Sequence, residues 1–154
     1  MTAAQRTCDL PDVAAMEQFG TAIARCLRAG DVVALSGGLG AGKTTLARAI
    51  IGASGYRGEV PSPSFSIVEL YELPALDFSL AHADFYRLKT PHEAEEIGLG
   101  DYRRNAALIA EWPENAGGFS HEPGCLSISL EIEEEGRQAI VVAGQDWHGR
   151  LPWQ

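Results

Sequence analysis

The sequence predicts a three-layer α/β domain with a central mixed, largely parallel sheet and a C-terminal antiparallel hairpin. Three stretches lead to this fold class. Residues 31–51 read as an apolar strand, a glycine-rich turn and a helix in direct succession. Residues 106–110 form a short apolar run of the kind that is buried in a parallel sheet. Residues 126–133 alternate strictly between apolar and polar side chains and precede a second apolar run at 137–142, which is typical of a hairpin.

The length and charge of the chain limit the classes of protein to which it can belong. A chain of 154 residues fits one domain with a single core, so we expect residues 1–154 to form one domain with an irregular tail at 146–154. The formal net charge of −9 argues against a nucleic-acid-binding surface, because such surfaces are rich in Lys and Arg. A nucleotide is therefore a better candidate ligand than a nucleic acid duplex.

Cysteine usage and hydropathy bear on the cellular compartment. The three cysteines, Cys8, Cys26 and Cys125, form no C-x-x-C pair, which favours reduced thiols over a disulfide framework or a zinc site. The N-terminus lacks the apolar core of a signal peptide, and no apolar run reaches the roughly 18 residues of a membrane span. We therefore expect a soluble, cytoplasmic protein that does not associate with a membrane.

Helix and strand signals divide the first third of the chain. Asp12 suits the N-cap of a first helix, and Gly30 ends it. The buried face of this helix is expected to carry apolar residues at three- and four-residue steps, namely Val13, Met16, Phe19, Ile23 and Leu27. A strand at 32–35 and a helix at 43–51 flank the glycine-rich turn.

The middle of the chain contains signals for two strands and a short helix. We expect the strands at 66–73 and 80–88, and a helix at 91–97 that begins with a capping box formed by Thr90 and Glu93. Before them, two prolines hold the chain extended and place the hydroxyls of Ser62 and Ser64 beside them. This segment is either a solvent loop or a switch-like segment that offers a hydroxyl to a γ-phosphate or Mg²⁺.

The glycine-rich turn fits the phosphate-binding pattern G-x-x-x-x-G-K-[ST] through Gly37, Gly42, Lys43 and Thr44. Glycines let backbone amides curl around an anion, and the following helix adds unpaired N–H groups and the positive end of its dipole. Lys43 can reach the β- and γ-phosphates, while the hydroxyl of Thr44 suits Mg²⁺. The expected nucleotide-binding segment comprises Gly40, Ala41, Gly42, Lys43, Thr44 and Thr45.

Two later acids are candidates for the same site. Asp84 lies in a mostly apolar run, where alternation places it on one face with His82 and Tyr86. A buried carboxylate is costly unless it is paired or near a metal, so Asp84 is either a Walker B acid or one half of a structural ion pair. For His82, packing or hydrogen bonding is favoured over metal binding, because no second histidine or cysteine stands at ligand spacing.

Glu111 ends the apolar run at 106–110. In open α/β sheets ligands bind beyond the carboxyl ends of the strands, so Glu111 is expected near the phosphate loop if its strand is parallel to the first. Its candidate roles are Mg²⁺ binding, directly or through water, and polarisation of the attacking water. A rim carboxylate without chemistry remains the alternative.

Several motifs occur together in this chain, in the order GGLGAGKTT, SPSF, HADFYRL, DYRR, EWPE and a closing hairpin with GRQA. Over residues 10–142 they resemble the TsaE (YjeE) family of small P-loop ATPases of bacterial tRNA threonylcarbamoyladenosine biosynthesis. The resemblance implies a three-layer P-loop NTPase domain that binds ATP and Mg²⁺. It also implies TsaD and TsaB as partners in making t6A37, with tRNA contacted mainly through those partners, and ATP hydrolysis that resets the machinery between turnovers.

The resemblance also assigns roles to individual residues. Lys43 would hold phosphates, Asp84 would be the Walker B acid, and Glu111 would be needed for Mg²⁺-dependent hydrolysis, so these three are the expected catalytic residues. The expected metal ligands are Thr44, Asp84 and Glu111. The family mostly has Thr at the position of Ser64, and Ser64 keeps the hydroxyl. Trp112 would flank the site, and Arg137 would approach the nucleotide or a partner.

Other functions share this loop. A small-molecule kinase is the main alternative and would place an arginine pair such as Arg103 and Arg104 on the transferred phosphoryl group, although no acceptor-binding motif is evident. A GTPase is less favoured, because the guanine motif N-K-x-D does not occur. A pure interaction protein would leave Lys43 and Thr44 idle.

Overall fold

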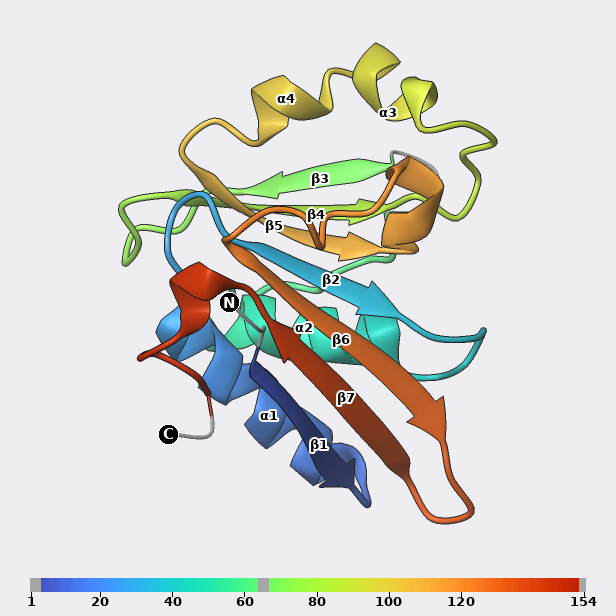
Figure 1. Ribbon diagram of the computed structural model, residues 1–154. Helices are drawn as coiled ribbons and strands as arrows, with labels where there is room; N and C mark the ends of the chain where they lie inside the picture. Colours follow the sequence, from blue (N-terminus) through green and yellow to red (C-terminus); the bar gives the residue numbers. More distant parts are fainter. Residues whose placement is uncertain (1–3, 64–66, 153–154) are drawn as a thin grey trace.

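The computed structural model describes residues 4–63 and 67–152 (Figure 1). In chain order the elements are β1 (Ala4–Leu10), α1 (Val13–Cys26), β2 (Val32–Ser36), α2 (Lys43–Ala53), β3 (Val68–Tyr71), β4 (Ser79–Asp84), α3 (His92–Glu96), α4 (Leu99–Tyr102), β5 (Ala106–Glu111), the 3-10 turn η1 (Pro113–Ala116), β6 (Cys125–Ile132), β7 (Arg137–Ala143) and the 3-10 turn η2 (Gln145–Trp147).

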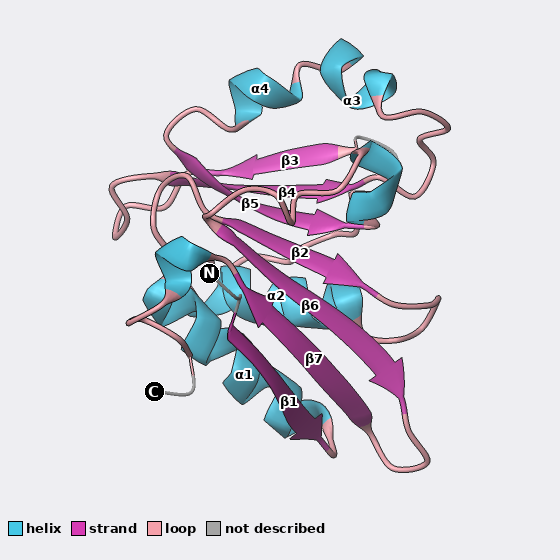
Figure 2. Ribbon diagram, viewed as in Figure 1, coloured by secondary structure: helices cyan, strands magenta, loops and turns pink. Residues whose placement is uncertain are grey.

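The strands of the described residues form one sheet of seven in the order β1-β7-β6-β2-β5-β4-β3 (Figure 2). The central strands β6, β2, β5 and β4 are parallel to one another. At the edges, β3 on β4, β7 on β6 and β1 on β7 are antiparallel. The predicted mixed sheet and C-terminal hairpin are therefore confirmed, with the parallel strands in the centre of the sheet.

Apolar side chains cover both faces of this sheet and form the three predicted layers. On one face, Val33 and Ile109 pack in a cluster with Met16 and Ile23 of α1 and with buried residues of α2. On the other face, the neighbouring strand positions pack with residues of α3, α4 and the loop after η1 in a second cluster: Val32, Ala34, Leu108, Ala110, Ala94, Leu99 and Phe119. Successive residues of a strand point to opposite faces, so the two clusters lie on opposite sides of the sheet.

Helix α1 begins as predicted, with the Asp12 carboxylate accepting a hydrogen bond of 2.8 Å from the backbone N–H of Ala15. Val13 is 63% exposed, so its predicted place on the buried stripe is wrong, because it stands at the first helical position, outside the apolar cluster. Helix α1 packs closely on α2 at Gly20, where a Cβ atom would lie 2.5 Å from the Cβ of Ala49. Only glycine lets the two helices approach this far.

Several predicted boundaries are wrong by a few residues. Strand β3 is shorter than the predicted 66–73. Strand β4 ends at Asp84, where a turn begins in which the N–H of Leu88 donates to the carbonyl of Phe85. Tyr86 therefore lies beyond the strand and does not share its face. Of the capping box at the start of α3, the half made by Glu93 is present, since its carboxylate accepts from the N–H of Thr90 at 3.2 Å.

Both ends of the chain hold structure that the sequence did not predict. Strand β1 pairs antiparallel with β7 along its whole length. The C-terminal tail is irregular apart from η2, yet Trp147 is fully buried and donates its Nε1–H to the carbonyl of Gly124 at 2.8 Å. Arg150 makes a two-pronged ion pair with the Asp31 carboxylate, at 2.8 Å and 2.6 Å.

No helix within the described ranges is both long and apolar enough to cross a membrane.

Candidate functional site

The phosphate loop joins the carboxyl end of β2 to α2 and depends on glycine at two positions. Gly37 has φ of 139°, and a Cβ atom there would lie 2.5 Å from the carbonyl oxygen of Leu130. Gly42, the residue before α2, has φ of 106°. Side chains are strained at these angles, so the sequence can form this loop only with glycine there.

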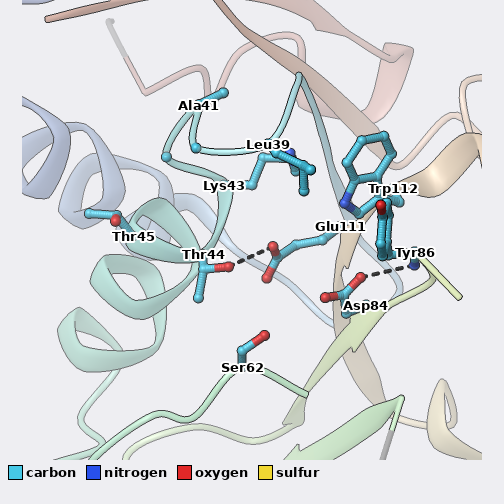
Figure 3. Close-up of a pocket in the computed structure, with 12 residues that line it drawn as sticks. Leu39, Ala41, Lys43, Thr44, Thr45, Ser62, Asp84, Tyr86, Glu111 and Trp112 are labelled. Atoms are coloured by element: carbon cyan, nitrogen blue, oxygen red, sulfur yellow. Dashed lines mark hydrogen bonds between the residues drawn. The ribbon is translucent and has the colours of Figure 1, made fainter. Parts of the chain in front are cut away.

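The loop forms one wall of a cavity of about 350 Å³ (Figure 3). The other walls come from the ends of β4 and β5 and from the segment before β3. The lining residues are Leu39, Gly40, Ala41, Gly42, Lys43, Thr44, Thr45, Ser62, Asp84, Tyr86, Glu111 and Trp112. The cavity therefore lies at the carboxyl ends of the parallel strands, which is where the sequence predicted a ligand site.

Lys43 is folded back onto its own loop. It is 5% exposed, and its ammonium donates to the carbonyls of Gly37 at 2.6 Å and Gly38 at 2.8 Å. The ammonium also lies 4.4 Å from the ring centroid of Trp112. Burial lowers the pKa of Lys43, and the nearby carboxylates, Glu111 foremost, oppose that change. These contacts hold a positive charge at the loop, where a phosphate would need it.

Glu111 has two hydrogen-bond partners. It is 2% exposed, and one carboxylate oxygen accepts from the hydroxyl of Thr44 at 2.8 Å (Figure 3). The other oxygen lies 2.7 Å from Nε2 of His82, which is fully buried. Three segments that are remote in the sequence therefore meet at one carboxylate.

Asp84 stands beside Glu111, because the two residues are register partners on the parallel strands β4 and β5. Its carboxylate accepts from the backbone N–H of Tyr86 at 2.9 Å. Burial raises the pKa of the Asp84 carboxyl, an effect that this hydrogen bond opposes and the charge of Glu111 reinforces. A cation between the two carboxylates would offset both the cost of burying the Asp84 charge and its repulsion by the charge of Glu111.

The oxygen atoms at this point suit Mg²⁺. Thr44, Asp84 and Glu111 present a hydroxyl and two carboxylates on one side of the cavity, and Figure 3 shows Ser62 facing them from the other side. Residues 4–63 and 67–152 contain no cluster of three or more His, Cys, Asp or Glu side chains that could hold a metal by themselves. Mg²⁺ is usually bound by one or two carboxylates together with substrate phosphates, so these residues fit that ion.

Trp112 and Tyr86 form the aromatic side of the cavity. Their ring centroids lie 4.9 Å apart. Trp112 has φ of 55°, a left-handed backbone conformation that is uncommon for a bulky residue. The predicted position of Trp112 beside the site agrees with this arrangement.

Arg137, at the start of β7, contacts the phosphate loop from behind. Its guanidinium donates to the carbonyl of Ala41 at 3.1 Å and to that of Gly40 at 3.0 Å. A second cavity of about 160 Å³ lies on this side of the loop, lined by Leu10, Asp12, Val13, Met16, Gly42, Thr45, Gly136 and Arg137. Arg137 therefore positions the loop and borders a second, mostly apolar cavity.

Of the predicted residues, one is not among those that the structure describes, and one pair lies away from this site. Ser64 lies outside the described residues. Arg103 makes an ion pair with Glu122 at 2.5 Å, and Arg104 lies 3.5 Å from Asp101 on the surface. This arginine pair precedes the first residue of β5, whereas the cavity lies beyond its last. The pair is consequently at the opposite end of the strand from the phosphate loop.

Sequence reasoning missed two contributions to the site. Leu39 lines the cavity and had no pattern that would distinguish it from an ordinary loop residue, whereas Ser62, which also lines it, belongs to the segment expected to be a solvent loop or a switch. The bond between His82 and Glu111 had a partial signal, since alternation placed His82 on the face of Asp84. Its acceptor, 29 residues away, has no local signature.

A parallel β-sheet, a glycine loop carrying Lys43 and Thr44, and a helix that starts at the loop define an α/β P-loop protein, the class that binds nucleotides through this loop. A solved structure of Bacillus subtilis YdiB has the same fold, with a TM-score of 0.71 and 23% sequence identity, and the match covers 93% of this chain and 88% of that one.

Comparison with known sequences identifies the family. The family model described as "Threonylcarbamoyl adenosine biosynthesis protein TsaE" matches residues 10–140, and the chain belongs to the TsaE family. The protein named tRNA threonylcarbamoyladenosine biosynthesis protein TsaE from Haemophilus influenzae is 33% identical over 140 residues, covering 87% of each chain. Its counterpart from Rickettsia typhi is 35% identical over 134 residues, covering 85% of this chain and 90% of its own.

Proposed function

We propose that this protein binds and hydrolyses ATP with Mg²⁺ as an accessory protein of tRNA N6-threonylcarbamoyladenosine (t6A37) biosynthesis, acting with TsaD and TsaB. The observation that carries the chemical part is the contact between the Thr44 hydroxyl and the buried Glu111 carboxylate, at 2.8 Å beside the phosphate loop. Membership of the TsaE family and the names of the relatives support the biosynthetic part.

The phosphates of ATP would be bound by the loop amides, the amino end of α2 and Lys43. Lys43 now donates to two backbone carbonyls, so binding would exchange these neutral acceptors for charged phosphate oxygens. The ammonium is charged in both states, but only phosphate oxygens add the attraction between opposite charges. This difference favours transfer of the ammonium from its own loop to the ligand.

Mg²⁺ would be held by Thr44 and Asp84, with Glu111 as a direct ligand or through water. When bound, the ion would offset the negative charge of the phosphates and orient them for in-line attack. Glu111 would align the attacking water, since its carboxylate already has a fixed orientation between two donors. Trp112 would shield the lysine side of the cavity from solvent, as its ring lies over the ammonium.

The second cavity would receive the adenine ring. It shares Gly42 and Thr45 with the phosphate cavity, and Met16 is one of its apolar walls. An aromatic base gains most from such apolar contact. This assignment would place the nucleotide across the loop, with its phosphates on one side and its base on the other.

The net charge and the thiols support the proposed location and partners. With a net charge of −9, the chain is poorly suited to bind tRNA directly, so TsaD and TsaB would contact the tRNA. Cys8, Cys26 and Cys125 are free thiols in the structure, which supports a reducing compartment, the cytoplasm.

A small-molecule kinase is the main alternative, and it shares the loop and the metal-binding oxygens. The arginine pair on which it would depend lies at the other end of β5, where Arg103 is engaged with Glu122. The residues that the structure describes therefore offer no observation that favours this alternative.

The test is to measure ATP hydrolysis by the purified protein with Mg²⁺, alone and with purified TsaD and TsaB. We expect slow hydrolysis by the protein alone and faster hydrolysis when the two partners are present together. Chelation of the metal should abolish hydrolysis in both cases. The matched control is Lys43→Ala in the same assay. Failure to bind any triphosphate would refute the proposal, and transfer of the γ-phosphate to a metabolite would favour the kinase.

A further inference from the structure

His82 is a buried polar residue that contacts Glu111 but does not line the cavity. It lies in β4 with no exposed surface, and its Nε2 is 2.7 Å from a carboxylate oxygen of Glu111. Its Nδ1 is buried and has no hydrogen-bond partner in the part of the chain that the structure describes. Buried polar atoms are rarely left unpaired, so a histidine kept in this position requires an explanation.

The role of each ring nitrogen of His82 follows once Glu111 acts as a carboxylate, as a metal ligand must. An ionised carboxylate can only accept hydrogen bonds, so Nε2 of His82 must be the donor to Glu111. A proton on Nδ1 as well would leave an unpaired N–H in the core. The arrangement therefore selects the ring tautomer that donates to Glu111 and leaves a bare nitrogen on the core side.

The sheet register places His82 directly behind the two acids. Asp84 and Glu111 are register partners, and His82 precedes Asp84 by two residues on the same face of β4. The imidazole therefore approaches Glu111 from the core, whereas Thr44 approaches it from the cavity. The two donors hold the carboxylate from opposite sides.

The bond from His82 is the one of the two that a ligand in the cavity leaves undisturbed. If the Thr44 hydroxyl turns to Mg²⁺, as the phosphate-loop pattern requires, its bond to Glu111 is altered. The hydrogen bond from His82 lies on the core side of Glu111, where it does not obstruct a ligand in the cavity. His82 is then the remaining group that fixes the direction of the Glu111 carboxylate.

We infer that His82 is the positioning residue of Glu111: its Nε2–H holds the carboxylate so that the opposite oxygen faces the metal and the attacking water. This inference rests on the proposed function. Hydrogen bonds behind a metal ligand fix its orientation, and their loss costs about 10- to 100-fold in metal affinity or activity.

Two variants separate the hydrogen bond from the bulk of the side chain. His82→Gln retains an N–H donor that can reach the position of Nε2, whereas His82→Leu fills the space and has no donor. Trp147→Phe is the matched control. It also removes a buried ring N–H donor, the one to Gly124, but at the amino end of the strands and away from the cavity.

The first experiment measures the Mg²⁺ dependence of binding of a fluorescent non-hydrolysable ATP analogue, together with kcat and thermal stability. For His82→Leu we expect the Mg²⁺ requirement to rise and kcat to fall, each by about 10- to 100-fold, while metal-free nucleotide affinity stays unchanged. His82→Gln should retain most of the wild-type Mg²⁺ affinity and kcat. Trp147→Phe should lose stability without a change in the Mg²⁺ requirement or in kcat. A His82→Leu protein that loses only stability would overturn the inference.

A second measurement is independent of nucleotide. In ¹⁵N NMR spectra of the ligand-free protein, His82 should show the Nε2-protonated tautomer, with a slowly exchanging ring proton that shifts in Glu111→Gln. The other tautomer would overturn the inference whatever the activity. If the wild-type protein binds no ATP, the proposed function fails, and this spectrum still decides whether His82 holds Glu111.

Discussion

The ion pair between Arg150 and Asp31 is expected to hold the C-terminal tail against the body of the domain. The arginine side chain is 11% exposed and the aspartate 4%. In Arg150→Ala the Asp31 carboxylate would stay buried, with the backbone N–H of Arg28 as its remaining donor. Removing one partner of a buried pair typically costs about 3–5 kcal/mol, because an uncompensated charge is left behind.

That loss is large enough to measure in this chain. At about 2–4 °C per kcal/mol for domains near this size, the midpoint of thermal unfolding should fall by roughly 6–20 °C. The assay is denaturant unfolding of Arg150→Ala, Asp31→Asn and the double variant, from which the coupling energy of the pair is obtained. The double variant should be less destabilised than the sum of the single variants, since neither charge is then left alone.

The matched control is Arg104→Ala. Arg104 and Asp101 also form an arginine–aspartate pair, but their side chains are 83% and 80% exposed. Exposed pairs contribute little to stability, so this variant should unfold like the wild type. Equal stabilities of Arg150→Ala and Arg104→Ala would show that the tail pair is not stabilising and would refute the reasoning.

Four further outcomes are expected. Lys43→Ala should lose nucleotide binding in a calorimetric titration, because the charge at the phosphate loop is removed; wild-type affinity would exclude it from the site. Glu111→Ala should retain nucleotide binding but lose turnover, and wild-type rates would remove that residue from the mechanism. Gly20→Val should destabilise the fold by about 1–3 kcal/mol in urea titrations, because a side chain there overlaps the next helix. Glu122 has a pKa lowered by its arginine partner, so its stabilising effect is full above its unfolded value and is lost as the pH falls through the lower folded value; Glu122→Gln should flatten the acid limb of a stability–pH profile, and an unchanged limb would contradict the assignment.

The parts of the site that were predictable from the sequence are those with local causes. The phosphate loop is specified by neighbouring residues, since glycine, lysine and threonine must stand at fixed spacings. The position of Glu111 was predictable in two steps. The apolar run indicated a parallel strand, and the carboxyl end of such a strand lies at the ligand site. Both steps depend on general rules of α/β sheets.

The parts that were missed depend on partners remote in the sequence. Strand β1 has mostly exposed polar side chains and lies at the edge of the sheet, so it has no apolar alternation to reveal it. The tail is fixed by Arg150 through a carboxylate 119 residues earlier. His82 likewise meets its acceptor only when β4 and β5 are paired. No pattern within a short window contains these contacts.

The guanidinium of Arg137 also affects the peptide planes that it touches. A trans peptide carries its C=O and N–H on opposite sides, so binding the carbonyls of Gly40 and Ala41 to Arg137 of β7 turns the next two amides away from the guanidinium, and the Ala41 N–H donates to the carbonyl of Gly38 at 3.2 Å. The path of the loop backbone is thus fixed before any anion arrives. Preorganisation of this kind lowers the ordering entropy that binding would otherwise cost. Arg137 can in this way strengthen phosphate binding through the backbone that it holds.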